Sequence, residues 1–487
     1  MSDRLHPLRW YDAITINIYY TGLTALSQTM TPLVIPLLVQ QFVGETRQGS
    51  AFGTIRLWSL MAALLVQSFM GMISDHSTLR LGRRRPFILV GTLGDIIVIG
   101  AIGFSASLAG EAGFWMLFSL VILLMISSNT AHGAVQGLIP DIVPEDKRGI
   151  YSGVKALFEV PLPLILIPFT IGNLISTGNL WGGLLVTMIV LAITMSVTLF
   201  APEKRFQTTP YKLDLEPIIR LVLMTTVFTL FILCLGFIIR QISNRIVSIS
   251  NVEALISMGL VTLLAILLAI GLGVYVSVQI SIGSEAQTNP SFTWWVINRL
   301  TFLVGATNIA SFTVFFLQGR LGMVRETAVG PATRLVMVVG LFILLVSLPA
   351  GWLADRFGHK NLVGVSGISA FVGTIVIISA PSLAVIYLGG IILGVAIGLF
   401  YTSNWALGTE IVSKNEAGRY LGISNLAGAG AGAIGAYIGG PTADFFTIHT
   451  PQIPGLGYVL LFIIYGILFL FSIFALKKVN PIPAFPI

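Results

Sequence analysis

The chain has 487 residues, of which 55% are hydrophobic and only 10% are charged. Soluble domains carry about 25% charged residues. A water-soluble protein of this size could not hide so much apolar surface, so the composition indicates a membrane protein. The net charge of +7 does not indicate nucleic acid, because the basic residues stand in short segments between apolar runs, a pattern that orients membrane proteins. The single Cys234 excludes an intrachain disulfide.

Apolar segments follow one another along the whole chain, and a spanning helix needs about 20 mostly apolar residues. Fourteen segments qualify: 13–40, 51–74, 86–108, 113–139, 150–175, 179–201, 217–240, 252–280, 292–317, 331–354, 361–380, 382–406, 418–442 and 456–476. The first has no cleavage signature before it and is interpreted as a retained span. The pair within 217–280 allows a second interpretation, a single re-entrant hairpin.

The positive charges indicate the orientation. If the N-terminus is cytoplasmic, 20 of the 27 Lys and Arg residues fall on the cytoplasmic side. An even number of spans then places both termini in the cytoplasm, in a protein of the plasma (inner) membrane.

Two markers recur in the same order along the chain. "GMISD" at 71–75 is echoed by "GWLAD" at 351–355, and "DIVPEDKRGIYSG" at 141–153 by "EIVSKNEAGRYLG" at 410–422. The repeat predicts two six-span halves, 1–201 and 290–487, with a cytoplasmic linker and two inserted spans at 202–289 between them. Two similar bundles suit alternating access, with a binding site near the midplane.

The turn after the second span carries a known pattern, "SDHSTLRLGRRRPFI" at 74–88. With its echo at 351–358 it resembles the signature loop of the major facilitator superfamily. The longer form, with "LVQ" at 65–67, resembles the sucrose-transporter and glycoside–cation symporter branch. The resemblance implies an all-α integral membrane protein of two six-helix bundles. The inserted pair departs from the usual twelve spans and gives about 14 transmembrane helices.

A carboxylate at the membrane edge is costly without a partner, which concerns Asp75. We expect Asp75 to pair with loop arginines and with the N-terminus of helix 418–442, forming a lock on the cytoplasmic side. The alternative is that the arginines only set the topology. The residues of this gating or signature loop are Gly71, Asp75, Gly82, Arg83, Arg84 and Arg85 and, in the second half, Gly351, Asp355, Arg356 and Gly358.

A sugar needs hydrogen-bonding side chains and an aromatic face within a mostly apolar cleft. Candidates inside the spans are Tyr19, Tyr20, Gln28, Asn129, His132, Gln136, Arg299, Tyr401, Asn404 and Trp405. In the repeat, His132 corresponds to Tyr401 and Gln136 to Trp405, so polar and aromatic residues recur at equivalent depth. For each residue taken alone, the alternative is a contact between helices.

A coupling site needs a carboxylate that can take and release a proton inside the membrane. Asp95 and Glu159 are candidates because of their depth. Asp141 is a candidate by resemblance, since "IPDI" at 139–142 resembles the segment that carries the coupling Asp in sucrose carriers. Its repeat partner Glu410 favours a structural role instead.

The sequence thus predicts a secondary active carrier for a small molecule, a sugar or glycoside, coupled to protons or sodium and monomeric in the lipid bilayer. The first alternative is proton-coupled efflux of drugs or other small molecules, and the second is a non-transporting membrane receptor. The pattern Gly430-x-Gly432-x-x-Gly435 lacks the preceding strand of a dinucleotide site. With no Walker, hydrolase or metal-ligand pattern, we predict no enzyme, no cofactor and no metal.

Overall fold

The computed structural model describes residues 8–203, 216–245, 252–283, 290–411 and 417–480, and every regular element in these ranges is helical. Thirteen of the described helices are long and apolar enough to cross a membrane, and they coincide with thirteen of the predicted segments. The remaining predicted segment, 418–442, lies within a further helix, α19 (Ala417–His449). The all-α membrane fold is therefore confirmed.

The chain divides into two compact units. Unit 1 comprises 1–34 and 62–215, and unit 2 comprises 35–61 and 216–487. The boundary falls inside α4 (Gln48–Asp75). The division predicted from the repeat therefore remains a prediction.

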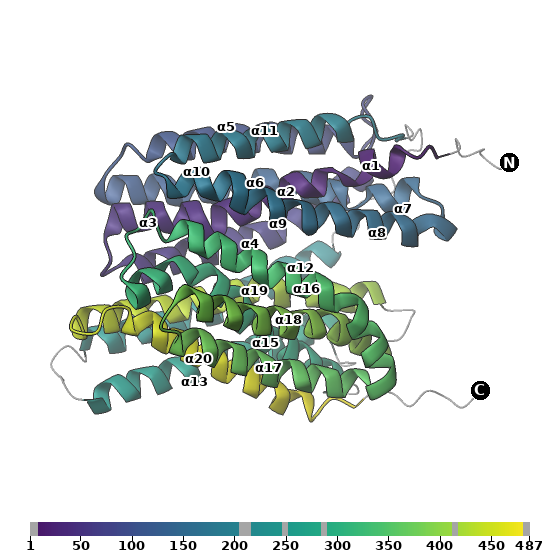
Figure 1. The fold of residues 1–487 in the computed structure, drawn as a ribbon. Coiled ribbons are helices and arrows are strands. Elements are labelled where there is room, and N and C mark those ends of the chain that lie inside the picture. Colours follow the sequence, from purple (N-terminus) through teal and green to yellow (C-terminus); the bar gives the residue numbers. More distant parts are fainter. Residues whose placement is uncertain (1–7, 204–215, 246–251, 284–289, 412–416, 481–487) are drawn as a thin grey trace. The chain divides into compact units, whose positions relative to one another are not determined.

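Unit 1 contains the helices of the first six spans, except α3 (Ile35–Val43) and the start of α4, which belong to unit 2 (Figure 1). They are α1 (Asp12–Asn17), α2 (Tyr19–Thr29), η1 (Met30–Val34), the end of α4, α5 (Arg85–Ser105), α6 (Gly110–Val135), α7 (Leu138–Ile142), η2 (Glu145–Lys147), α8 (Arg148–Glu159), α9 (Pro161–Leu166), η3 (Ile167–Ile171), α10 (Gly172–Ser176) and α11 (Leu180–Thr198). Prolines interrupt two spans, because each lacks the backbone N–H of a regular helix. Pro32 lies in the π-helical turn η1, and Pro161 and Pro168 open α9 and η3.

Glycines bring α4 and α6 of unit 1 close together. A Cβ atom on Gly133 would lie 2.5 Å from the carbonyl oxygen of Gln67 and 2.9 Å from the nitrogen of Gly71. A Cβ on Gly71 would lie 3.5 Å from the Gly133 oxygen, an ordinary contact. Small residues allow membrane helices to approach in this way, and here Gly133 is the more restricted of the pair.

Unit 2 is built around α15, whose side chains are almost all buried. Its helices are α3 (Ile35–Val43), the start of α4, α12 (Glu216–Arg245), α13 (Val252–Ile282), α15 (Pro290–Leu321), α16 (Val329–Phe357), α17 (His359–Ser379), α18 (Leu383–Ile411), α19 and α20 (Leu456–Leu476). Phe302 of α15 stacks on Phe400 of α18 at 3.7 Å between ring centroids. The carboxylate of Asp444 accepts hydrogen bonds from the backbone nitrogens of Gly49 at 2.8 Å and Ser50 at 2.7 Å, which holds the start of α4 within this unit.

The inserted pair, α12 and α13, belongs to unit 2. The helices have 30 and 31 residues, or about 45 Å at 1.5 Å per residue, which favours two spans over a re-entrant hairpin. They pack on each other and on α19. Phe228 fills the space over Gly430, where a Cβ would lie 2.7 Å from its ring, and the hydroxyls of Thr262 and Thr442 are 2.7 Å apart. Close neighbours thus account for Gly430, Gly432 and Gly435 of α19, where a Cβ would meet Phe228, Arg56 and Asn308.

Candidate functional site

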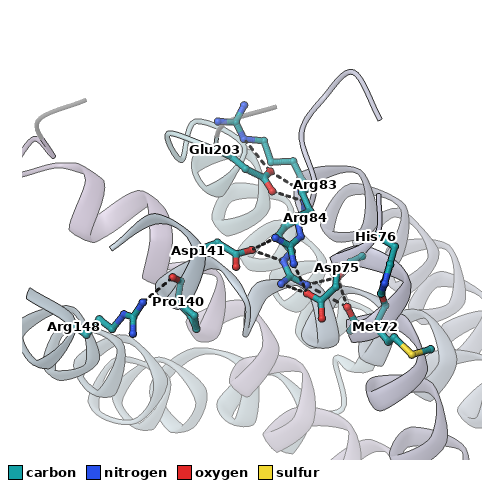
Figure 2. Close-up of polar contacts among 12 residues, drawn as sticks. Met72, Asp75, His76, Arg83, Arg84, Pro140, Asp141, Arg148 and Glu203 are labelled. Carbon is teal, nitrogen blue, oxygen red and sulfur yellow. Dashed lines mark hydrogen bonds and ion pairs between the residues drawn. The ribbon is translucent and has the colours of Figure 1, made fainter. Parts of the chain in front are cut away.

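A network of ion pairs holds the turn after α4 in unit 1 (Figure 2). The Arg84 side chain is only 5% exposed; its Nε lies 2.9 Å from Asp141 Oδ2, and its Nη2 donates to Asp75. Arg83 Nη2 donates to the same Asp75 oxygen at 2.9 Å. The expected pairing of Asp75 with loop arginines is found here. A role for it in gating remains a prediction.

The sequence did not indicate which arginine would be enclosed. Arg84 also donates to the carbonyl oxygen of Gly71 at 3.2 Å and to the hydroxyl of Ser74. Its guanidinium fits only because residue 137 is glycine, since a Cβ there would lie 2.2 Å from Arg84 Cζ. Arg84 thus joins α4, α7 and the start of α5, whereas the Arg83 side chain is 19% exposed.

Glu203 completes this turn and was missed in the sequence, because nothing in its spacing relates it to residues 82–85. Its carboxylate accepts hydrogen bonds from the backbone nitrogens of Arg84 and Arg85, where the first N–H groups of α5 need acceptors. Burial raises the pKa of Glu203 above its ordinary value, and the hydrogen bonds offset only part of this effect. Gly82 has a φ of +114°, and a Cβ there would lie 2.4 Å from Glu203 Oε2, so both backbone and space favour glycine.

The corresponding turn of unit 2 follows α16. His359 Nδ1 lies 2.7 Å from Glu410 Oε1, and its Nε2 lies 3.7 Å from Asp355 Oδ1. Gly358 ends α16 with a φ of +87°. One histidine therefore joins the acidic residues that correspond, in the repeat, to Asp75 and Asp141.

Two other predicted residues of this second turn lie outside that contact. Arg356 sits over aromatic rings, with its Cζ 5.5 Å from the Trp352 centroid and 5.6 Å from that of Phe357. A Cβ on Gly351 would meet no atom within 4 Å, so no close approach of helices explains this glycine.

A polar cluster in unit 1, called cluster 1, joins α2, α6 and α8. Lys155 Nζ lies 4.3 Å from the ring centroid of Tyr20 and 3.4 Å from Glu159 Oε2. The His132 ring meets the edge of Tyr20 with centroids 6.4 Å apart, and its Nε2 is 3.2 Å from Gln136 Nε2. Lys155 was not among the predicted site residues, although its position inside the predicted span 150–175 could have singled it out.

The other candidates of unit 1 make packing contacts. Tyr19 is buried, with its hydroxyl 2.5 Å from Thr92 Oγ1, and Asn129 donates to its own helix at the Met125 oxygen, 2.8 Å away. Asp95 is fully buried and accepts a hydrogen bond from Ser127. Gln28 lies on α2, just over two turns beyond Tyr20. The hydrogen bonds of Tyr19, Asn129 and Asp95 thus go to groups outside cluster 1.

A second cluster, cluster 2, lies in unit 2 between α15 and α18. Arg299 Nη1 donates to Asn404 Oδ1 at 3.0 Å, and the guanidinium lies 5.4 Å from the Trp405 ring centroid. Tyr401 and Trp405 are 44% and 43% exposed and stand four residues apart, on one face of α18. Two residues that the sequence did not single out complete the cluster, Trp295 and Asn298.

Metal binding finds no support in the part of the chain that the structure describes, where no group of three or more His, Cys, Asp or Glu side chains could hold an ion.

Comparison with known proteins agrees with this architecture. Residues 302–484 match the family model described as Major Facilitator Superfamily. The chain is 33% identical over 141 residues to the sucrose transport protein SUC3 of Arabidopsis thaliana, covering 24% of this chain and 22% of that protein. It is 27% identical over 208 residues to the sucrose transport protein SUT2 of Oryza sativa, covering 34% and 40%. The matched part thus spans less than half the length of these relatives.

Solved structures match the fold over nearly the whole chain. The nucleoside transporter NupG superposes with a TM-score of 0.65 at 14% identity, covering 96% of this chain and all of that one. An auto-inhibited POT family peptide transporter gives a TM-score of 0.66 at 13% identity, covering 98% and 99%. At such low identity these likenesses describe the fold.

The fold is that of an all-α membrane protein, and residues 302–484 match the Major Facilitator Superfamily model. The chain also resembles the sucrose transport proteins.

Proposed function

We propose that the protein is a secondary active transporter that moves a sugar or glycoside across the membrane by alternating access, driven by protons or another cation. Cluster 2 is the observation that carries the proposal. The rings of Tyr401 and Trp405 are partly exposed and stand beside the hydrogen-bonding groups of Arg299 and Asn404, between α15 and α18. Aromatic faces and paired donors are what a sugar needs.

Cluster 1 supports the same proposal. Tyr20, His132, Gln136 and Lys155 bring an aromatic ring and hydrogen-bonding groups together within unit 1. The relatives, which are sucrose transport proteins, agree with a sugar substrate. We further propose a monomer in the plasma (inner) membrane with both termini in the cytoplasm, and the halves 1–201 and 290–487 as its two bundles.

For the coupling carboxylate we favour Glu159 over Asp141 and Asp95. Asp141 is engaged by Arg84 and, at 3.7 Å, by Arg83, and Asp95 is fully buried. Glu159 is 39% exposed, and its ion pair is with Lys155 of cluster 1. Protonation of Glu159 would release Lys155, which links the proton to the groups that we propose for substrate binding.

The test uses the purified chain in sealed vesicles with an imposed pH gradient and a panel of sugars and glycosides. We expect sugar-driven proton uptake, abolished in Glu159→Gln and retained in Asp141→Asn. Glu145→Gln is the matched control, because that side chain is 90% exposed on η2. Loss of proton uptake in Asp141→Asn with retention in Glu159→Gln would reverse the assignment.

The same vesicles separate the alternative functions. Extrusion of apolar dyes without response to any sugar would favour drug efflux. The absence of transport of any sugar or dye under every imposed ion gradient would favour a non-transporting receptor.

A further inference from the structure

Arg299 is a charged residue in the third turn of α15 and is surrounded by neutral groups. Its Nη1 donates to the amide oxygen of Asn404, and its Cζ lies 5.4 Å from the Trp405 centroid and 5.9 Å from that of Trp295. Tyr401 is a further neighbour from α18. None of these side chains carries the negative charge that would balance a guanidinium.

No carboxylate among the described residues forms an ion pair with Arg299, whereas Arg83, Arg84 and Arg325 each have one. An unbalanced charge inside a membrane protein is costly, and such residues mark ligand or ion pathways. The aromatic rings offset only part of the cost, since a cation–π contact contributes about 0.5–2 kcal/mol. The missing counter-charge is the feature that a ligand could supply.

A chain of buried amides holds Arg299 in place. Asn404 donates to Asn298 Oδ1 at 2.8 Å, and Asn298 donates to the backbone oxygen of Ser472 on α20, also at 2.8 Å. The Trp295 indole donates to the backbone oxygen of Asn404 at 2.9 Å, and both asparagine side chains are fully buried. The amide orientation is therefore fixed, so little conformational freedom remains to be lost when a ligand binds.

The guanidinium retains donors for a partner. Arginine carries five N–H donors in a planar fork, and here Nε has no hydrogen-bond partner. A carboxylate matches that fork with two parallel hydrogen bonds. Since one positive charge is present among neutral neighbours, a singly charged carboxylate balances it, whereas a phosphate dianion would leave an excess negative charge.

We propose that Arg299, Tyr401 and Trp405 form a subsite for a sugar or glycoside that carries a carboxylate, such as a uronic acid. Arg299 binds the carboxylate, and the rings of Tyr401 and Trp405 cover the apolar face of the sugar. The inference rests on the proposed function, because it names the class of substrate within the same carrier.

The experiment measures binding to the full chain in lipid nanodiscs with matched ligand pairs. Methyl β-D-glucuronide is compared with methyl β-D-glucoside, and methyl α-D-galacturonide with methyl α-D-galactoside, since each pair differs only in the carboxylate. We expect at least one uronide to bind tenfold or more tightly than its neutral partner. Arg299→Gln should reduce that preference to about one, and Arg299→Lys should keep part of it, because the charge remains but the fork is lost.

Arg320→Gln is the matched control, an exposed arginine on the last turn of the same helix, and should leave the preference unchanged. The melting temperature without ligand shows that each variant is folded, and Arg299→Lys carries the test if Arg299→Gln does not fold. Equal binding of both members of each pair, unchanged in Arg299→Gln or Arg299→Lys, would overturn the inference and leave the sugar carrier intact. Tighter binding of methyl 6-phospho-β-D-glucoside than of the uronide would overturn the carboxylate class. Absence of binding and transport for every sugar would contradict the proposed function itself.

Discussion

The turns that follow α4 and α16 occupy equivalent places in the two halves of the sequence, yet they are built differently. In unit 1, Arg84 is almost fully enclosed and joins Asp75 and Asp141. In unit 2, His359 is 20% exposed and joins Asp355 and Glu410, which are 80% and 40% exposed. Both turns place a basic side chain between two acidic residues, but unit 1 adds the buried Arg84 to Arg83, whose 19% exposure is close to the 20% of His359.

The difference shows that the two turns depend on different forces. Arg84 is almost fully buried, and its removal would take away charge-assisted hydrogen bonds to Asp75 and Asp141 and leave only Arg83 to pair with them. His359 and its two acidic partners are all partly exposed, and ion pairs at the surface contribute little to stability. We therefore expect the first turn to contribute more to stability than the second.

The largest effect is expected for removal of the central base. Arg84→Ala should lower the free energy of unfolding by about 3 kcal/mol, because it leaves Asp75 and Asp141 short of a partner. His359→Ala should lower it by less than about 1 kcal/mol, as for exposed ion pairs. Thermal unfolding of both variants in the same nanodiscs measures the difference, and equal losses would show that burial does not distinguish the turns.

Substitution of the glycine in each turn is expected to change the free energy of unfolding by a smaller amount, and the two substitutions are better matched. Gly82→Ala should cost about 2 kcal/mol, because its positive φ is strained for alanine and the new Cβ would meet Glu203. Gly358→Ala should cost about 1 kcal/mol, because it has only the strain, with the nearest atom 3.8 Å away. Combining Gly82→Ala with Glu203→Ala should recover part of the loss. No recovery would mean that the backbone alone requires glycine.

The smallest effect concerns pH and Glu203. Because its pKa is raised in the folded protein, its contribution to stability is full below about pH 4.5 and declines as pH rises through the raised pKa. Glu203→Gln removes this titration and keeps a hydrogen-bond acceptor. The melting temperature of the native protein relative to the variant should therefore fall as the pH rises above about 4.5. A relative melting temperature that rises over this range would contradict the assignment.

The local pattern of the sequence predicted the helices and both turns, because runs of apolar residues and the motifs beside them are continuous in the chain. It did not identify Arg84 as the buried arginine, since that depends on the space beside Gly137, in the turn between α6 and α7. Glu203, 119 residues from Arg84, was missed for the same reason.

The candidate binding residues show the same limit. Depth in a span selected Tyr19 and Tyr20 equally, but only Tyr20 contacts the polar groups of cluster 1, while Tyr19 bonds to Thr92. The order of residues within a helix gives their depth. Which side chains meet depends on how far each helix is rotated about its axis, and the sequence of a single span does not determine that rotation.

The inserted pair has a consequence for engineering a smaller version of this protein. Because Phe228 covers Gly430 and Thr262 shares a hydrogen bond with Thr442, cutting out α12 and α13 would expose Gly430 and the bare hydroxyl of Thr442 on α19 to lipid. A twelve-helix derivative would therefore need new apolar side chains along α19 before it could be expected to fold.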